Sequence, residues 1–162
     1  MGEAGSQGTK LAADRMLGRL AKWLRIIGQD VTYGEHLAGY GLIRAARKEG
    51  RLILTRDRTI AKRNPPEYLL IRSDRFREQL QQVIQAFGLD PLKNAFRRCV
   101  ECNALLEPIA KEDVKEKVPP YVFSTQERFS FCRGCRRVYW PATHQQKMLE
   151  ELKQIGVGAT GN

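Results

Sequence analysis

The residues best suited to chemistry in this chain include four cysteines, which form two pairs of identical spacing. Cys99 and Cys102 make one CxxC pair, and Cys132 and Cys135 make the other. Two such pairs can bring four thiolates into a tetrahedron, the geometry that structural zinc prefers. A site closed by four cysteines leaves no open coordination position, so we expect zinc here to build structure and not to perform chemistry. Free thiols or a redox pair are the alternative.

Two acidic residues follow apolar runs that have the character of strands. Asp14 comes directly after Leu11–Ala13, and Asp57 comes two residues after Arg51–Thr55. In an open parallel sheet, sites form just beyond the carboxyl ends of the strands. Carboxylates gathered there can hold Mg²⁺ or Mn²⁺, and such an ion orients a phosphodiester and activates a water. The alternative is that each acid is a helix cap or an ion-pair partner of nearby arginines.

Three other polar residues have weaker claims to a functional role. Asp74 follows the fourth expected strand and has the same two interpretations as the other acids. Asp30 opens a strand at the opposite sheet edge, so we interpret it as structural. His144, in the stretch YWPATH, is a candidate phosphate contact or proton donor, with a hydrogen-bonded structural histidine as the alternative.

Basic residues surround the expected acidic site. The net charge is +10 and the pI is about 9.8, and the segment from Arg44 to Arg63 holds eight lysines and arginines against two acids. This balance favours an anionic partner, nucleic acid first, over a basic protein whose charge only aids solubility. The candidate contacts to the phosphate backbone are Arg15, Arg19, Arg56, Arg58, Arg63 and His144.

The elements that must position these residues alternate along the first part of the chain. Expected strands are Leu11–Ala13, Asp30–Tyr33, Arg51–Thr55 and Tyr68–Ile71, and expected helices are Arg15–Gly28, Leu42–Gly50 and Arg75–Gly88. This alternation is typical of an α/β fold, a parallel sheet flanked by helices. Right-handed crossovers would bring the strand ends to one edge of that sheet.

The first expected helix has two unlike sides. Leucines and isoleucine at three- and four-residue spacing predict a face toward the core. Four basic residues predict a stripe on the other side: Arg15, Arg19, Lys22 and Arg25.

Composition divides the chain into four expected parts. Residues 1–10 are a disordered leader, residues 11–90 an α/β domain, residues 91–148 a zinc ribbon with its flanks, and residues 149–162 a C-terminal tail. Aromatic residues near the second CxxC pair either fill the small core of the ribbon or stack on RNA bases. No run approaches the roughly 20 apolar residues of a membrane span, and no export signal is present, so we expect a cytoplasmic protein without a membrane partner.

Five stretches of the sequence, taken in order, resemble one known family. They are DRMLGRLAKWLRIIGQD, EGRLILTRDR, RSDRFREQLQQVI, RCVECNALL and FCRGCRRVYWPATH. Together they resemble the PIN-like ribonuclease family named after the C-terminal domain of the exonuclease Mut-seven. The resemblance covers roughly Leu11 to Met148. It implies a PIN-like α/β domain with a C-terminal zinc ribbon and metal-dependent RNA cleavage, with Asp14 and Asp57 matching acids of the family motif.

The chain departs from the family pattern at two positions. The family usually carries a further acid at the start of the second helix, where this chain has AGYG, Ala38–Gly41. Glu35 is the nearest acid, and Thr59 stands where PIN nucleases often carry another. The implied ligands of Mg²⁺ or Mn²⁺ are therefore Asp14 and Asp57, with Asp74 or Glu35 as a further acid.

Three functions are consistent with these patterns. The first is a metal-dependent ribonuclease; phosphate contacts carry no base information, so the sequence leaves DNA open as a substrate. The second is a catalytically lapsed PIN-like protein that binds RNA or the ribosome, which the missing acid at AGYG supports. The third is a zinc-ribbon adaptor for another protein, which the basic charge disfavours.

Overall fold

The computed structural model describes residues 8–141 and 143–160 of the chain, and within the last helix the side chains of residues 145–156. Residues 1–7 of the expected leader lie outside the described part. A four-stranded parallel sheet forms the centre of the first part, in the order β2-β1-β3-β4. Its strands are β1 (Leu11–Ala13), β2 (Val31–Thr32), β3 (Leu52–Thr55) and β4 (Tyr68–Leu70). The predicted parallel α/β sheet is thus confirmed.

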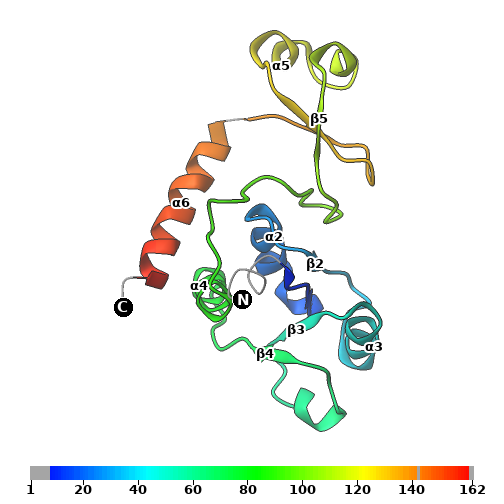
Figure 1. Cartoon of the computed structure of the whole chain (residues 1–162), viewed down its shortest axis with the longest axis vertical. Helices are drawn as coiled ribbons and strands as arrows, with labels where there is room; N and C mark the ends of the chain where they lie inside the picture. Colours follow the sequence, from blue (N-terminus) through cyan, green and yellow to red (C-terminus); the bar gives the residue numbers. More distant parts are fainter. Residues whose placement is uncertain (1–7, 142, 161–162) are drawn as a thin grey trace.

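Helices cover both faces of this sheet (Figure 1). One face packs against α2 (Gly18–Ile26) and α4 (Phe76–Phe87), and the other packs against α3 (Gly39–Glu49). Successive side chains of a strand point to opposite faces. Accordingly Leu11 belongs to the core under α2 and α4, while Ala12 belongs to the core under α3. Strands buried on both faces explain the continuous apolar run before Thr55.

The ends of the helices follow from glycine and from local capping. Both α3 and α4 end at left-handed glycines, Gly50 at φ 67° and Gly88 at φ 61°. This conformation costs glycine little because it has no Cβ. The first expected helix differs from its prediction at its start: Arg15–Leu17 is a 3₁₀ turn, η1, because Asp14 caps the backbone before α2 begins.

One member of the expected basic stripe is buried and structural. Arg25 is only 6% exposed, so its predicted place on the outer side of the helix is wrong. Its Nε donates to the carbonyl of Val31 at 2.9 Å, and its Nη1 donates to the carbonyl of Val100 at 2.8 Å. A buried guanidinium needs such acceptors. Arg25 therefore links the α/β part to the segment that carries the first cysteine pair.

The second part of the chain is a small antiparallel sheet in the order β5-β6-β7. It comprises β5 (Glu107–Ile109), β6 (Phe129–Phe131) and β7 (Val138–Tyr139), with η3 (Lys111–Val114) and α5 (Pro120–Thr125) between the first two strands. Its own core is small, with Val114, Val118 and Phe129 buried. This arrangement, with its four clustered cysteines, confirms the predicted small module after the parallel sheet.

The chain ends in a long helix, α6 (Thr143–Thr160), which returns to the α/β part beside α4 (Figure 1). Leu152 and Ile155 are buried in the same core as α2 and α4. The proposed domain boundaries at residues 90 and 148 stay predictions; the second falls inside α6. No helix in the described part of the chain is long and apolar enough to cross a membrane.

Candidate active site and metal centre

Asp14 is buried at the carboxyl end of β1. It is 4% exposed, and its amide donates to the carbonyl of Leu54 in the neighbouring strand at 2.9 Å. Its Oδ2 accepts a hydrogen bond from the hydroxyl of Thr55 at 2.7 Å. A buried carboxylate is costly unless it is hydrogen bonded, so Thr55 stabilises Asp14 in place.

Asp57 is linked to Asp14 through the hydroxyl of the same threonine. Its backbone amide donates to the Thr55 hydroxyl oxygen at 3.0 Å, and that hydroxyl in turn donates to Asp14. We call these three residues the Asp14–Thr55–Asp57 network. Since β1 and β3 are adjacent parallel strands, the network spans two strand ends at one edge of the sheet.

The carboxylate of Asp57 is engaged by the chain itself. Its Oδ1 accepts from the amide of Thr59 at 2.9 Å and from the Thr59 hydroxyl at 2.6 Å. Its Oδ2 accepts from Nη1 of Arg63 at 2.7 Å. These hydrogen bonds, first from Thr59 and then from Arg63, favour the ionised form and lower the pKa of Asp57 below its usual value.

At Ala38–Gly41, where the chain lacks the acid of the family pattern, an aromatic ring lies beside a cation. Tyr40, in the first turn of α3, lies with its ring 5.6 Å from the guanidinium carbon of Arg63. The preceding segment reaches the acidic edge, because the amide of Arg15 donates to the carbonyl of Leu37 at 2.9 Å. Arg63 thus bridges Asp57 and the turn in which the family usually carries an acid.

Glu35 and Asp74 are exposed. Neither carboxylate forms a group of possible metal ligands with Asp14 and Asp57. Within the described residues, the cysteines form the one group of three or more cysteine, histidine or acidic side chains whose ligand atoms lie within 4.8 Å of one another. The role of both acids therefore stays a prediction.

The candidate RNA contacts differ in how accessible they are. Arg15, Arg19, Arg56 and Arg58 are exposed, Arg63 is half-buried against Asp57, and the side chain of His144 lies outside the described part. The guanidinium of Arg19 stacks 3.8 Å from the centre of the Phe76 ring. Phe76 also stacks on Trp23, with ring centres 5.7 Å apart. The sequence pattern gave no signal for this stack.

The four cysteine thiols converge as the spacing predicts. All four Sγ atoms lie within 4.8 Å of one another, with Cys99 to Cys135 at 3.5 Å and Cys102 to Cys132 at 3.2 Å. Zn–S bonds of about 2.3 Å in a tetrahedron place the sulfurs somewhat under 4 Å apart, so the cluster fits zinc. Its chemistry and its size make it a candidate metal centre.

The electrostatics of Cys99 suit a thiolate ligand. Burial raises the pKa of this thiol, but hydrogen bonds from the Tyr139 hydroxyl at 3.0 Å and from the amides of Cys102 and Glu101 outweigh it. The resulting pKa of Cys99 is lowered to about 7. A metal ligand must be deprotonated, so this environment favours metal binding.

The first cysteine pair also docks onto the edge of the parallel sheet. Asn103, directly after Cys102, accepts from the amide of Val31 at 3.0 Å and donates to Asp30 at 2.7 Å. Asp30 is in turn paired with Arg51 at 2.7 Å. Asn103 thus satisfies an amide of the edge strand β2, a role that no sequence pattern indicated because its partners are distant in the chain.

Comparison with known proteins places this fold in a family. The sequence matches the family described as the Mut7-C RNAse domain over residues 9–152, from just before β1 into α6. Comparison with curated proteins and with solved structures gave no match. The match covers most of the chain, both the parallel sheet and the cysteine module, so the chain belongs to the Mut7-C RNAse domain family.

Proposed function

We propose that this protein is a metal-dependent ribonuclease whose reaction takes place at the Asp14–Thr55–Asp57 network. One observation carries the proposal: at the carboxyl edge of a parallel sheet, a buried threonine hydroxyl bonds the carboxylate of Asp14 and the backbone amide of Asp57. The family match over residues 9–152 supplies the reaction class. Open parallel sheets characteristically place their sites at this edge.

Asp14 and Asp57 supply the hard oxygen ligands that Mg²⁺ or Mn²⁺ requires. The bound ion would supply Lewis acidity and a means of orienting the phosphodiester. Asp57 stays ionised because Thr59 and Arg63 lower its pKa. Arg63 already occupies Oδ2 of Asp57, so an ion has to compete with this guanidinium for the carboxylate.

The substrate proposal is RNA held through its backbone. The exposed arginines Arg15, Arg19, Arg56 and Arg58 surround the acidic edge in a chain of net charge +10. Cations in contact with phosphates release condensed counterions, so binding should weaken steeply as salt rises.

The four cysteines would hold a structural zinc ion. The antiparallel module buries only three hydrophobic side chains in its own core, which is little for independent stability. A closed thiolate site supplies folding free energy to such a module directly.

The test is cleavage of an end-labelled structured RNA by protein freed of Mg²⁺ and Mn²⁺ but retaining its cysteine-bound zinc. We expect cleavage only after Mg²⁺ or Mn²⁺ is restored, and its loss in Asp57→Asn. Asp113→Asn is the matched control, because Asp113 is an exposed acid of the antiparallel module. Cleavage that is unaffected by chelation would contradict the proposed mechanism.

A second candidate function is RNA binding without cleavage. It is favoured by the engagement of both Asp57 oxygens by Thr59 and Arg63, together with the missing acid at Ala38–Gly41. Under this alternative, salt-sensitive RNA binding persists while no ion restores cleavage. Arg63→Ala separates the two functions, since freeing Oδ2 should raise cleavage at low ion concentration only in an active nuclease.

A further inference from the structure

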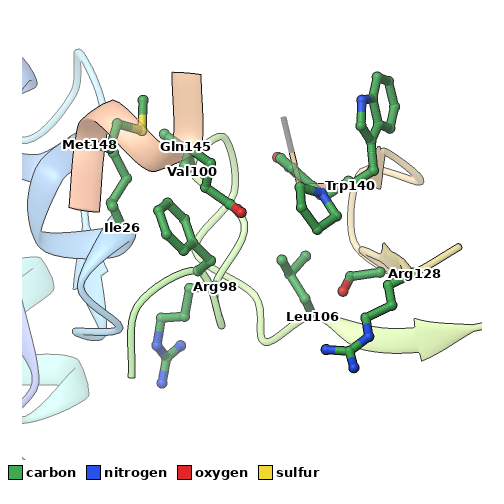
Figure 2. Close-up of a pocket in the computed structure, with 12 residues that line it drawn as sticks. Ile26, Arg98, Val100, Leu106, Arg128, Trp140, Gln145 and Met148 are labelled. Carbon is green, nitrogen blue, oxygen red and sulfur yellow. The ribbon is translucent and has the colours of Figure 1, made fainter. Parts of the chain in front are cut away.

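A cavity of about 330 Å³ lies between the antiparallel module and the α/β part of the molecule. Its lining comes from the end of α2, from the segment around the first cysteine pair, from β6 and β7, and from the start of α6. Figure 2 shows Ile26 and Met148 on one side of it, and Leu106 and Trp140 toward the other. The cavity is thus assembled only when the two parts of the chain are docked together.

The walls of the cavity suit a flat aromatic ligand. Phe96, Tyr139 and Trp140 contribute rings, while Ile26, Leu106 and Met148 contribute aliphatic surface. Its volume is at the lower end of the range for small-molecule sites, so it is sized for one ring system and not for a helix. Ser130 and Gln145 add polar groups able to form hydrogen bonds with a ring edge.

Two arginines give the cavity its charge. Arg98 donates from Nε to the carbonyl of Gly28 at 3.1 Å and from Nη1 to that of Asn103 at 2.8 Å, which fixes its plane. Arg128 is exposed. Among the described ion pairs neither guanidinium has a carboxylate partner, and Figure 2 shows Arg98 toward the end with Ile26 and Arg128 toward the opposite end. An apolar cleft with two arginines at its border fits a ligand that is both aromatic and anionic.

We propose that this cavity binds an unpaired nucleobase of an RNA strand, with Arg98 and Arg128 contacting the adjoining phosphates. The proposal rests on the proposed function for the identity of the ligand. Stacking on aromatic side chains beside a basic surface is the usual physical means of holding single-stranded nucleic acid. A base inside a duplex is already stacked and paired, so the cavity selects single-stranded or bulged RNA.

The position of the cavity relative to the acidic edge sets the path of the strand. Asp14 directly precedes the 3₁₀ turn that leads into α2, while Ile26 is the last residue of α2 and lines the cavity. The nine residues of α2 span roughly 13 Å. Arg19 and Lys22 are exposed along that length and would contact the backbone between the two sites. The cavity would therefore fix which phosphodiester of a strand reaches Asp14 and Asp57.

The test uses the fluorescence of Trp140 in Trp23→Phe protein, since the chain holds two tryptophans. A single-stranded 2′-O-methyl oligonucleotide, which resists cleavage, is titrated without Mg²⁺ or Mn²⁺. We expect quenching of Trp140 and a loss of affinity of about tenfold in Val100→Phe, which fills the cavity without changing charge. Arg128→Ala should weaken binding more than Arg97→Ala, a matched loss of an exposed arginine outside the cavity. Thermal unfolding verifies that each variant is folded.

The outcomes separate this inference from the proposed function. Unquenched Trp140, with Val100→Phe and Arg128→Ala binding as tightly as Arg97→Ala, overturns the nucleobase site even if RNA is cleaved. Quenching of Trp140, while neither Mg²⁺ nor Mn²⁺ supports cleavage by protein that keeps Asp57, upholds the site and overturns the nuclease. A duplex that quenches Trp140 as strongly as the single strand, or a failure of every variant to bind RNA at low salt, overturns the nucleobase site as well.

Discussion

Thr55 is the residue on which the geometry of the acidic edge depends. Its fully buried hydroxyl donates to Asp14 and accepts from the amide of Asp57, so it holds both acids to the ends of their strands. Replacement by valine keeps the shape but leaves a buried carboxylate and an amide without this partner. Thr55→Val should therefore lower the free energy of unfolding by about 1–3 kcal/mol. RNA cleavage should fall at least tenfold.

Urea unfolding and the cleavage rate check this prediction. Thr32→Val in the strand β2 is the matched control, since Thr32 is a strand threonine with no described hydrogen bond from its hydroxyl to either acid. Equal effects of the two substitutions on cleavage would show that Thr55 does not position the acids.

Thr59 controls the ionisation of Asp57. Its hydroxyl and amide hydrogen bonds are the main cause of the lowered pKa, with Arg63 contributing less. Thr59→Val removes the hydroxyl bond and should raise the pKa of Asp57 toward its ordinary value, as measured by NMR titration of the carboxyl carbon. Arg58→Ala is the control, because Arg58 is adjacent but makes none of these bonds.

The sign of the associated pH effect follows from the lowered pKa. A carboxyl that is more acidic in the folded state contributes stability above its unfolded pKa of about 4, and this contribution disappears as pH falls through the folded value. Thr59→Val should therefore flatten the loss of stability below pH 4. The effect is small because Asp57 is partly exposed, and solvent screens the interactions of its carboxylate. An unchanged NMR titration in Thr59→Val would show that the Thr59 hydroxyl does not set the pKa of Asp57.

Among the elements, α6 contributes to the hydrophobic core in a way that the sequence did not predict. Leu152 is fully buried and Ile155 nearly so, in the core shared with α2 and α4. Leu152→Ala should cost about 2–5 kcal/mol of folding free energy, the usual range for a buried leucine. Lys153→Ala, at the next and exposed position, should change stability by less than about 0.5 kcal/mol. Similar melting temperatures for both variants would contradict the packing of α6.

The strands and helices of the first part were predictable because each carries a local signal. Apolar runs marked β1 and β3, and glycines marked the ends of α3 and α4. The spacing of Met148, Leu152 and Ile155 is also helical, but their partners lie far away in α2 and α4, so the local pattern predicts only a tail from residue 149 onward. Arg25 was misplaced for the same reason: its acceptors Val31 and Val100 come from tertiary contacts.

The sequence predicted which residues form the candidate site. It did not predict the hydrogen bonds and the ion pair that connect them. Strand ends indicated Asp14 and Asp57, and cysteine spacing indicated the thiol cluster. The link through Thr55, the pairing of Asp57 with Arg63 and the docking of Asn103 onto Val31 are relations between separate segments. Periodicity and spacing report on one segment at a time, so they carry no information about such relations.

At the scale of the whole molecule, the cysteine module and the α/β part should respond together to loss of metal. The first cysteine pair is joined to the sheet by Asn103 at the edge strand β2 and by Arg25 at the carbonyl of Val100. A structural zinc ion supplies much of the folding free energy of a small module, so its removal should release both contacts. The buried guanidinium of Arg25 and the amide of Val31 would then lose their partners.

We therefore expect zinc chelation to lower the melting temperature of the entire protein and not only to unfold the module. The zinc released, the far-ultraviolet circular dichroism and the thermal transition of the α/β part are the quantities to follow. Asn103→Ala separates docking from metal binding, because it should retain zinc yet reproduce part of the destabilisation by removing the bonds to Val31 and Asp30. Asn94→Ala is a control on the segment before the first cysteine pair. If chelation melts the module while the remaining transition is unchanged, the two parts fold independently and the contacts of Asn103 and Arg25 do not couple them.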